Sequence, residues 1–174
     1  MKKRRKNERG FTLIELLVVI TVLVILATFL VPQVGTIRER GRRAKCLENL
    51  RILGVGLHTY AADNDGAFPT DDTAEAAFRK IYVQGNITDP LVFACPSTAG
   101  KPTGTPGAGP GSPSLNLTGV DFQYNTADLA DQSTATTVIA SDKAANHTNP
   151  AGYNLLHVAG NVSQSDTAPS GTFG

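Results

Sequence analysis

The chain of 174 residues is long enough for one domain with an appended segment and too short for two full domains. Its formal net charge of +1 conceals an asymmetry: residues 1–10 hold six of the sixteen Lys and Arg side chains and one of the fifteen acids. The rest of the chain therefore has ten basic and fourteen acidic side chains. That mildly acidic balance argues against a nucleic-acid-binding protein, which would present a basic face.

An apolar run of 21 residues, Phe11–Val31, follows the basic cluster and is interrupted only by three threonines and Glu15. As a helix it would span roughly 31 Å, the thickness of the hydrocarbon core of a membrane. The apolar core of a cleaved secretory signal has only about 7–15 residues, so the run predicts a membrane-spanning helix instead. The basic cluster at residues 1–10 is larger and closer to the run than the one after it, which places the amino terminus in the cytoplasm.

Glu15 is the unusual residue of this run, because a carboxylate at the middle of a membrane costs about 2.5–3.5 kcal/mol. Near one end of the run, its side chain can simply lie at headgroup level and face water. Cleavage after Gly10 would offer another explanation, since Phe11 would then carry an amino group one helical turn from Glu15. In an assembly, that amine can pair with the Glu15 of a neighbouring subunit, so that neither buried charge lacks a partner.

The segment RGFTLIELLVV resembles the class III signal of type IV pilins and type II secretion pseudopilins. The matching residues are Gly10, Phe11, Thr12, Leu13 and Glu15. The resemblance implies that a prepilin peptidase cleaves between Gly10 and Phe11 and methylates the Phe11 amine. It also implies that the mature chain leaves the inner membrane through an assembly platform and joins other pilin-like subunits in a helical filament.

Pro32 follows the apolar run at a position where members of this family often carry a proline. It has no N–H for the carbonyl of Thr28, and its ring crowds that turn, so we expect a kink in the helix. Pro32 can equally mark the exit of the chain from the membrane.

Residues 33–62 are expected to continue the helix in amphipathic form. Apolar side chains recur there at helical spacing, at Ile37, Ala44, Leu47, Leu50, Leu57 and Ala61. This stripe is predicted to pack on a globular head, and the basic side chains at residues 38–45 read most simply as a solvated face. Gly54 and Gly56 weaken the helix by about 1 kcal/mol each and can allow a close approach of the head. Turn residues at 64–69 predict that the helix ends there.

The remaining residues, 63–174, are expected to form the head. A short helix is predicted in residues 71–84, with Asp72 as its N-cap. Residues 100–113 contain five glycines and four prolines and predict an exposed loop. Short segments rich in β-branched and aromatic residues predict strands, with a tight hairpin at Ala159–Gly160; the segments are 120–124, 136–141, 153–158 and 161–164.

The predicted fold class is therefore α+β, with a long amino-terminal helix packed on a small antiparallel sheet. The expected organisation is a cleaved leader at 1–10, a transmembrane and filament-core helix at 11–32, its amphipathic continuation at 33–62, and the head at 63–174. The head also resembles pseudopilin-like proteins of planctomycete- and verrucomicrobia-type bacteria, in CLENLRILGVGLHTYAADNDGAFP, CPS and SDKAANH…NLLHVAGNV. That subgroup usually has a His followed ten residues later by Asp-Gly. Here eleven residues separate His147 from Ala159–Gly160, so no role of that aspartate transfers.

Two cysteines, Cys46 and Cys95, both lie beyond the apolar run on the predicted periplasmic side. A disulfide is favoured in that oxidising compartment, with two buried free thiols as the alternative. The chain has no HExxH, GxSxG or glycine-rich phosphate-binding motif. Asp142 and His147 form the best candidate cluster for a site, but a polar surface loop explains them more simply. We therefore expect no catalytic residues, no metal and no cofactor.

These observations together predict a structural subunit of a type II secretion-like pseudopilus, and not an enzyme. The expected partners are other pilin-like subunits, the prepilin peptidase and N-methyltransferase, the assembly platform and membrane lipid, without nucleic acid. The expected location is the bacterial inner membrane, with one span and the head in the periplasm, and then a periplasmic or extracellular filament. Two alternatives stay open: a surface type IV pilin for adhesion, motility or DNA uptake, and an uncleaved membrane-anchored protein that binds a ligand through Asp142 and His147.

Overall fold

The computed structural model describes residues 11–30, 34–98, 102, 120–143, 146–147 and 152–173. The leader with Gly10, the predicted kink at Pro32 and nearly all of the predicted loop at 100–113 lie outside the described residues. The chain divides into two units, residues 1–38 and residues 39–174. The second unit contains the sheet and is the head.

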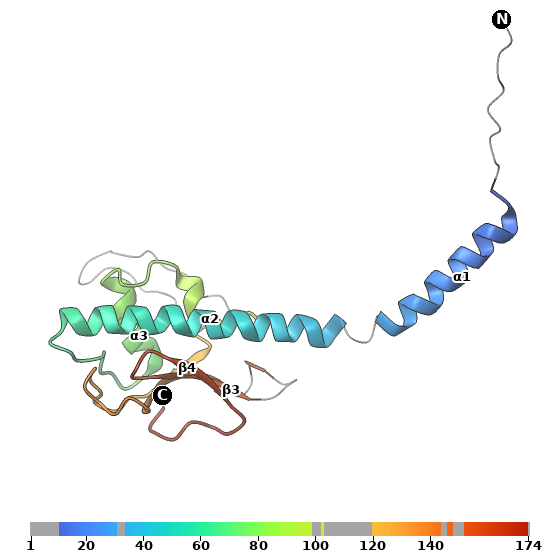
Figure 1. Cartoon of the computed structure of the whole chain (residues 1–174). Helices are drawn as coiled ribbons and strands as arrows, with labels where there is room; N and C mark the ends of the chain where they lie inside the picture. The colour runs from blue at the N-terminus through green and yellow to red at the C-terminus, as the bar shows by residue number, and fades with distance from the viewer. Residues whose placement is uncertain are drawn as a thin grey trace, which may run out of the picture. The chain divides into compact units, whose positions relative to one another are not determined.

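The first unit contains the helix α1, Leu13–Leu30 (Figure 1). Its sequence, LIELLVVITVLVILATFL, has no glycine or proline, and the hydroxyls of Thr21 and Thr28 donate to the carbonyls of Val18 and Ile25. Those bonds give both hydroxyls an acceptor within the helix, so neither has to be satisfied from outside. Within the part of the chain that the structure describes, no helix combines the length and the apolar character needed to cross a membrane.

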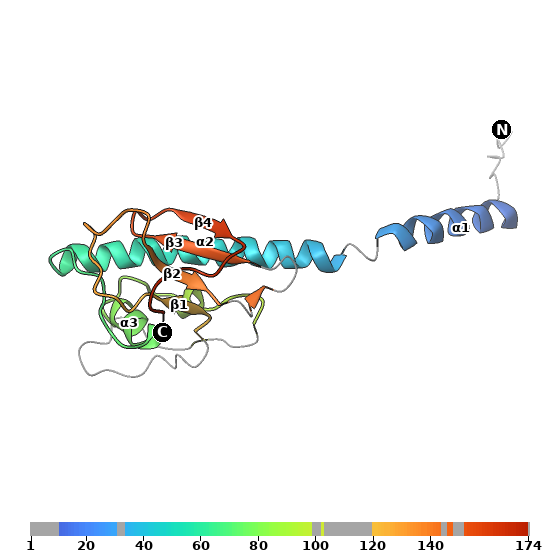
Figure 2. The same cartoon turned by 90° about the horizontal axis from the view of Figure 1, so that it is seen from below.

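The second helix, α2, covers Val34–Asp63 and runs along the head from residue 39 onward (Figures 1 and 2). Its end confirms the predicted stop. Asp65 and Gly66 both have positive φ, 55° and 84°, and the Gly66 N–H donates to the carbonyl of Ala61 over 2.8 Å. Such a left-handed pair satisfies the last carbonyls of the helix and turns the chain back toward the head.

The buried stripe of α2 differs in part from the predicted one. Leu50, Leu57 and Ala61 are buried as expected, whereas Ile37 and Ala44 are exposed, and for these two the prediction was wrong. The apolar side chains that α2 buries are Cys46, Leu50, Leu53, Leu57 and Ala61. This set keeps the spacing of three and four residues along the helix, and it places Cys46 and Leu53 on the buried face instead of Ala44.

Close approach at the two glycines of α2 is confirmed. A Cβ atom added at Gly54 would lie 2.9 Å from Cδ1 of Leu156, and one added at Gly56 would lie 2.5 Å from Cγ1 of Ile87. Both neighbouring side chains are buried. The missing Cβ atoms therefore let the sheet and the chain after α3 come within contact distance of the helix backbone.

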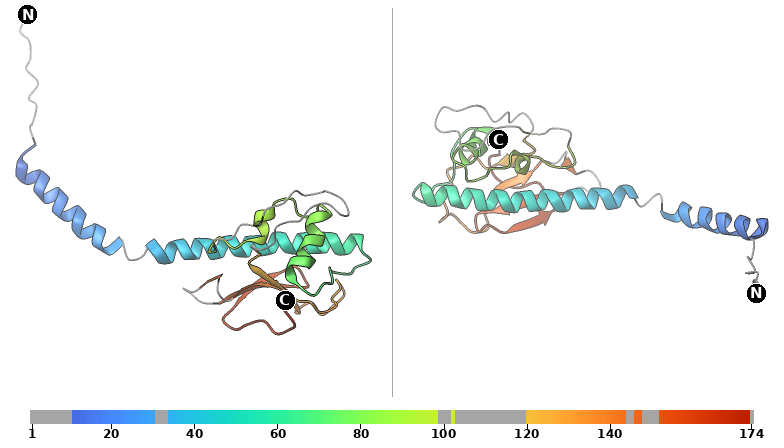
Figure 3. Two further views of the ribbon diagram at one scale, coloured as in Figure 1. Left: turned by 180° about the vertical axis from the view of Figure 1, so that it is seen from behind. Right: turned by 90° about the horizontal axis from the view of Figure 1, so that it is seen from above.

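The short helix predicted in residues 71–84 is α3, Ala74–Val83. Its N-cap is Thr73, whose hydroxyl oxygen accepts a hydrogen bond from the Ala76 N–H over 3.2 Å. The prediction of Asp72 as the cap was therefore wrong by one residue. A 3₁₀ turn, η2, Pro90–Phe93, follows and is capped by Asp89. Views from behind and from above show α3 and η2 beside α2 (Figure 3).

Each of the four predicted strand segments overlaps a strand of one antiparallel sheet of order β1-β2-β3-β4. The strands are β1 Phe122–Tyr124, β2 Val138–Asp142, β3 Tyr153–His157 and β4 Val162–Ser165. In register, Phe122 pairs with Asp142, Ser141 with Leu155, and Leu156 with Val162. The predicted α+β fold class is thus confirmed.

The predicted hairpin at Ala159–Gly160 connects β3 and β4. The His157 N–H donates to the carbonyl of Asn161 over 3.0 Å, so three residues form the loop, and Gly160 is the one with positive φ, 79°. A three-residue loop with glycine in the left-handed conformation is a common hairpin connection. Ala159 avoids the strained conformation that a two-residue turn would demand of it.

The core of the head lies between α2, α3 and the sheet. The ring of Phe78 on α3 packs against Phe93 of η2 at 5.6 Å and edge-on against Tyr124 of β1 at 5.4 Å between centroids. Tyr124 is fully buried, and its hydroxyl donates to the carbonyl of Pro69 over 2.9 Å. This aromatic cluster fixes α3 on β1, while the leucines of α2 face the central strands.

Candidate functional sites

The surface of α1 is apolar on all sides. Every side chain from Phe11 to Phe29 is exposed, including Phe11 at 83% and Phe29 at 69%. A helix that is hydrophobic all round is a buried or membrane helix, because water does not stabilise such a surface. The exposed side chains of α1 therefore call for apolar surroundings.

Glu15 has a specific local role at the start of α1. Its Oε2 accepts hydrogen bonds from the Thr12 N–H over 2.9 Å and from the Thr12 hydroxyl over 2.8 Å, while the Glu15 N–H donates to Thr12 Oγ1 over 3.3 Å. This reciprocal arrangement is a capping box, which satisfies N–H groups that the first helical turn leaves without partners. The sequence analysis missed it, although Thr-x-x-Glu before an apolar run is its known signature.

The predicted assembly role of Glu15 stays a prediction. Phe11 is exposed next to the capping box, and Gly10 lies outside the described residues. Both hydrogen bonds from Thr12 use Oε2, and among the described residues no donor is recorded on Oε1. The second carboxylate oxygen can therefore accept an amine from another subunit while the cap is kept.

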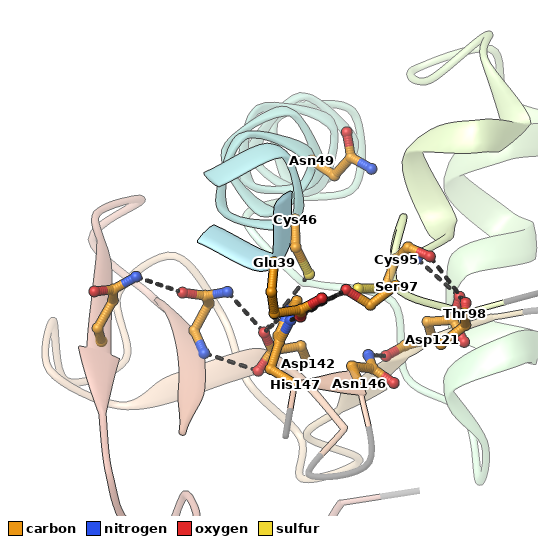
Figure 4. A network of polar contacts seen from close by, with 12 residues as sticks. Glu39, Cys46, Asn49, Cys95, Ser97, Thr98, Asp121, Asp142, Asn146 and His147 are labelled. Carbon is orange, nitrogen blue, oxygen red and sulfur yellow. Dashed lines mark hydrogen bonds and ion pairs between the residues drawn. The ribbon is translucent and has the colours of Figure 1, made fainter. Parts of the chain in front are cut away.

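A second group of polar residues is buried in the head (Figure 4). Cys46 comes from α2, Cys95 from the segment after η2, Asp142 from the end of β2, and His147 from the loop that follows. All four are between 0% and 1% exposed. The interpretation of Asp142 and His147 as a polar surface loop was therefore wrong, because both side chains lie inside the head.

The four side chains point at one another. Nε2 of His147 lies 3.5 Å from Sγ of Cys95 and 3.4 Å from Oδ2 of Asp142. Sγ of Cys46 lies 3.6 Å from the same oxygen of Asp142. Donor atoms of Cys46, Cys95 and His147 all lie within 4.8 Å of one another, which is close enough to hold a metal ion. Both cysteines are free thiols in the structure, and the predicted disulfide stays a prediction.

A ring of outer contacts holds these four side chains. Nδ1 of His147 lies 2.8 Å from Oε1 of Glu39 on α2, and the Ser97 hydroxyl donates to the same oxygen over 2.9 Å. On the other side, Asn154 of β3 holds Asp142: its N–H donates to Oδ1 over 2.8 Å and its side-chain amide to Oδ2 over 2.7 Å. The orientation of both groups is thus fixed by separate partners.

The proximity of these groups shifts their pKa values. Burial alone would lower the pKa of His147, but its hydrogen bonds to Asp142, Cys95 and Glu39 outweigh it and raise the pKa to about 10. The hydrogen bond from Cys46, with help from His147, lowers the pKa of Cys95 to about 5 despite burial. The same bond, together with burial and the nearby carboxylate of Asp142, raises the pKa of the Cys46 thiol. The contacts within the cluster thus lower the pKa of the Cys95 thiol and raise the pKa of the His147 imidazole.

Glu39 and Ser97, which make outer contacts to this cluster, were not singled out in the sequence. Glu39 lies among arginines on α2, where the pattern indicated only a solvated helix face. Its partner, His147, is 108 residues further along the chain. The signals in the sequence were the two cysteines and, separately, the pair Asp142 and His147.

Comparisons with known proteins relate this chain to other bacterial proteins. Residues 5–31 match the family model described as "Prokaryotic N-terminal methylation motif". The chain is 34% identical over 80 residues to "Type II secretion system core protein G" of Klebsiella michiganensis, covering 46% of this chain and 56% of that protein. It is 39% identical over 80 residues to the protein of the same name from Vibrio cholerae, covering 46% and 54%.

A further relative is aligned over nearly its whole length. The "ComG operon protein 3 homolog" of Bacillus licheniformis is 30% identical over 95 residues, which are 55% of this chain and 95% of that protein. By contrast, the chain spans about half the length of the type II secretion relatives that it matches. No solved structure matches the chain significantly.

A methylation motif at the start of an apolar helix, followed by an α+β head, defines a pilin-like protein. With the relatives just described, the chain belongs to the type IV pilin and pseudopilin family.

Proposed function

We propose that this protein is a structural subunit of a type II secretion-like pseudopilus. The observation that carries the proposal is α1, a helix with an apolar surface on every side. The methylation motif covers this helix, and the capping box of Thr12 and Glu15 stands at its start. Such a surface is stabilised when equivalent helices pack together in the centre of a filament. The names of the type II secretion relatives support a pseudopilus over a surface pilus.

Processing prepares α1 for that role. We propose that cleavage between Gly10 and Phe11 creates an amino group, which is then methylated. Because Oε2 of Glu15 is occupied by Thr12, the amine of a neighbouring subunit is bound at Oε1. One helix is thereby placed in register against the next, and the buried amine and carboxylate neutralise one another.

Before assembly, the subunit is proposed to reside in the bacterial inner membrane with its amino terminus in the cytoplasm and its head in the periplasm. The apolar run Phe11–Val31 and the basic leader support this location. The proposed partners are the prepilin peptidase, the assembly platform and other pilin-like subunits. An enzymatic role has no support from the names of the relatives, and the burial of Asp142 and His147 argues against a ligand-capture surface.

Replacing Glu15 by alanine tests this proposal. We expect Glu15→Ala to enter the membrane normally but to lose most of its filament yield, because the amine of the neighbouring subunit loses its partner. Glu48→Ala is the matched control, since Glu48 is an exposed glutamate whose ion pair with Arg51 contributes little. Membrane fractions and sheared filaments are compared by immunoblot.

The result distinguishes the alternatives. Wild-type filament yield from Glu15→Ala contradicts the proposed registration. Filaments on the surface of unmanipulated cells favour a type IV pilin over a pseudopilus, and chains that keep the leader intact favour a membrane-anchored binding protein.

A further inference from the structure

We propose that the head binds one zinc ion through Cys46, Cys95, His147 and Asp142. This metal site is independent of filament assembly and revises the expectation of a head without metal. Two thiolates, one imidazole and one carboxylate form a donor set that zinc prefers, whereas calcium and magnesium require oxygen ligands.

Three of the distances within the cluster match edges of a tetrahedral zinc site. With bonds of about 2.3 Å to sulfur and about 2.0–2.2 Å to nitrogen and oxygen, a tetrahedron has sulfur–nitrogen and sulfur–oxygen edges of about 3.6 Å. Its nitrogen–oxygen edge is about 3.4 Å. The structure has 3.5 Å from Cys95 Sγ to His147 Nε2, 3.6 Å from Cys46 Sγ to Asp142 Oδ2, and 3.4 Å from that nitrogen to that oxygen.

The outer contacts are also those of a metal site. A metal-bound histidine typically donates its other ring N–H to a carboxylate, which fixes the tautomer and the ring orientation. Glu39 holds Nδ1 of His147 in this way over 2.8 Å, which leaves Nε2 to face the cysteines. Asn154 binds both oxygens of Asp142.

The site is closed, which indicates a structural metal. All four ligands are buried, and they come from α2, the segment after η2, and the end of β2 with its following loop (Figure 4). Four protein ligands leave no position for a substrate or a reactive water. One ion would thus join the helix to the sheet close to Glu39, where the head begins.

A disulfide between Cys46 and Cys95 is the competing arrangement. It would use only the two sulfurs and would leave the carboxylate of Asp142 and the ring of His147 converging on a neutral bridge. The observed convergence of these donors, with His147 held by Glu39 and Asp142 held by Asn154, is what a cation requires. The two arrangements exclude one another, because a bridged sulfur is not a thiolate ligand.

The test uses the full-length chain, extracted from membranes in detergent without oxygen and incubated with zinc chloride. After removal of free metal, we expect one zinc per chain by elemental analysis. Cobalt in place of zinc should give the visible absorption of a tetrahedral site with thiolate-to-metal charge transfer. Cys95→Ser and His147→Gln should each lose both signals.

The control is His157→Gln. His157 is also hydrogen bonded through both ring nitrogens, to the carbonyl of Thr136 and the hydroxyl of Ser163, but it lies outside the cluster. It should keep one zinc per chain. If the ligand variants fail to fold, Glu39→Gln gives the answer, since loss of a supporting carboxylate should weaken zinc binding about 10- to 100-fold without changing the stoichiometry.

Two results would overturn the proposal. The first is a folded wild-type chain that retains no zinc when its thiols are reduced. The second is a chain recovered from membranes whose cysteines resist alkylation under denaturing conditions with chelator, which identifies a disulfide. Either result leaves the amino-terminal processing, and hence the proposed filament role, untouched.

Discussion

Alanine at Gly56 should destabilise the head even though alanine is the better helix former. In the structure a Cβ atom there would lie 2.5 Å from Cγ1 and 2.6 Å from Cδ1 of Ile87. Ile87 is only 4% exposed, so its side chain cannot swing into solvent to make room. Overpacking of this kind costs about 1–3 kcal/mol, against a gain of about 1 kcal/mol from helix propensity.

Gly41→Ala is the matched control on the same helix. Gly41 is exposed, and nothing lies within 4 Å of a Cβ atom added there. This variant should gain the propensity without the collision and be more stable by about 1 kcal/mol. The two alanine variants should therefore differ in unfolding free energy by about 1–3 kcal/mol, with Gly56→Ala the less stable.

The assay is urea unfolding of the full chain in detergent, followed by near-ultraviolet circular dichroism of tyrosine. The chain has four tyrosines and no tryptophan, and all four tyrosines lie in the head, at Tyr60, Tyr82, Tyr124 and Tyr153. The signal therefore reports the head without a contribution from α1. Equal stability changes in the two variants would refute the close contact between α2 and Ile87.

The remaining predictions concern the cap of α3 and the metal. Thr73→Ala should lower the stability of the head by about 1 kcal/mol, because it removes the acceptor for the Ala76 N–H, whereas Asp72→Ala should change the stability little. The same tyrosine signal measures both variants. A larger effect at Asp72 would restore Asp72 as the N-cap. If zinc binds only the folded head, zinc at a thousand times its dissociation constant should add about 4 kcal/mol to the unfolding free energy, and chelator should remove it. Unchanged unfolding with chelator, under reducing conditions, would contradict that gain.

Elements with a regular local pattern were predictable from the sequence. The strands were recognisable because β-branched and aromatic residues alternate in short runs between turn residues. The end of α2 was recognisable because Asp65 and Gly66 are residues that tolerate positive φ. In both cases the physical cause acts within a few residues, so a short stretch of sequence is enough to recognise it.

The buried cluster was not predictable in the same way. Asp142 and His147 were noticed as a pair, but polar residues at the end of a strand are usually exposed, so the pattern favoured a surface loop. Their burial depends on Cys46 and Glu39 of α2, about one hundred residues away in the chain. Only the antiparallel sheet, laid along α2, brings these groups together (Figure 2).

The buried face of α2 was predictable only in part. Spacing alone predicted an amphipathic helix, and several of the buried positions were correct. The predicted stripe nevertheless included Ile37 and Ala44, which are exposed, and left out Cys46, which was considered only as a partner in a disulfide. Cys46 is fully buried and continues the row that Leu50 and Leu53 define.

The proposed processing is tested by mass spectrometry of the amino-terminal peptide, recovered from envelopes of the native host. We expect a chain that begins at Phe11 and carries one methyl group on its amine. That result would show that the amine partner proposed for Glu15 exists. A chain that still begins at Met1 would leave Glu15 with its capping role alone and would contradict assembly into a filament.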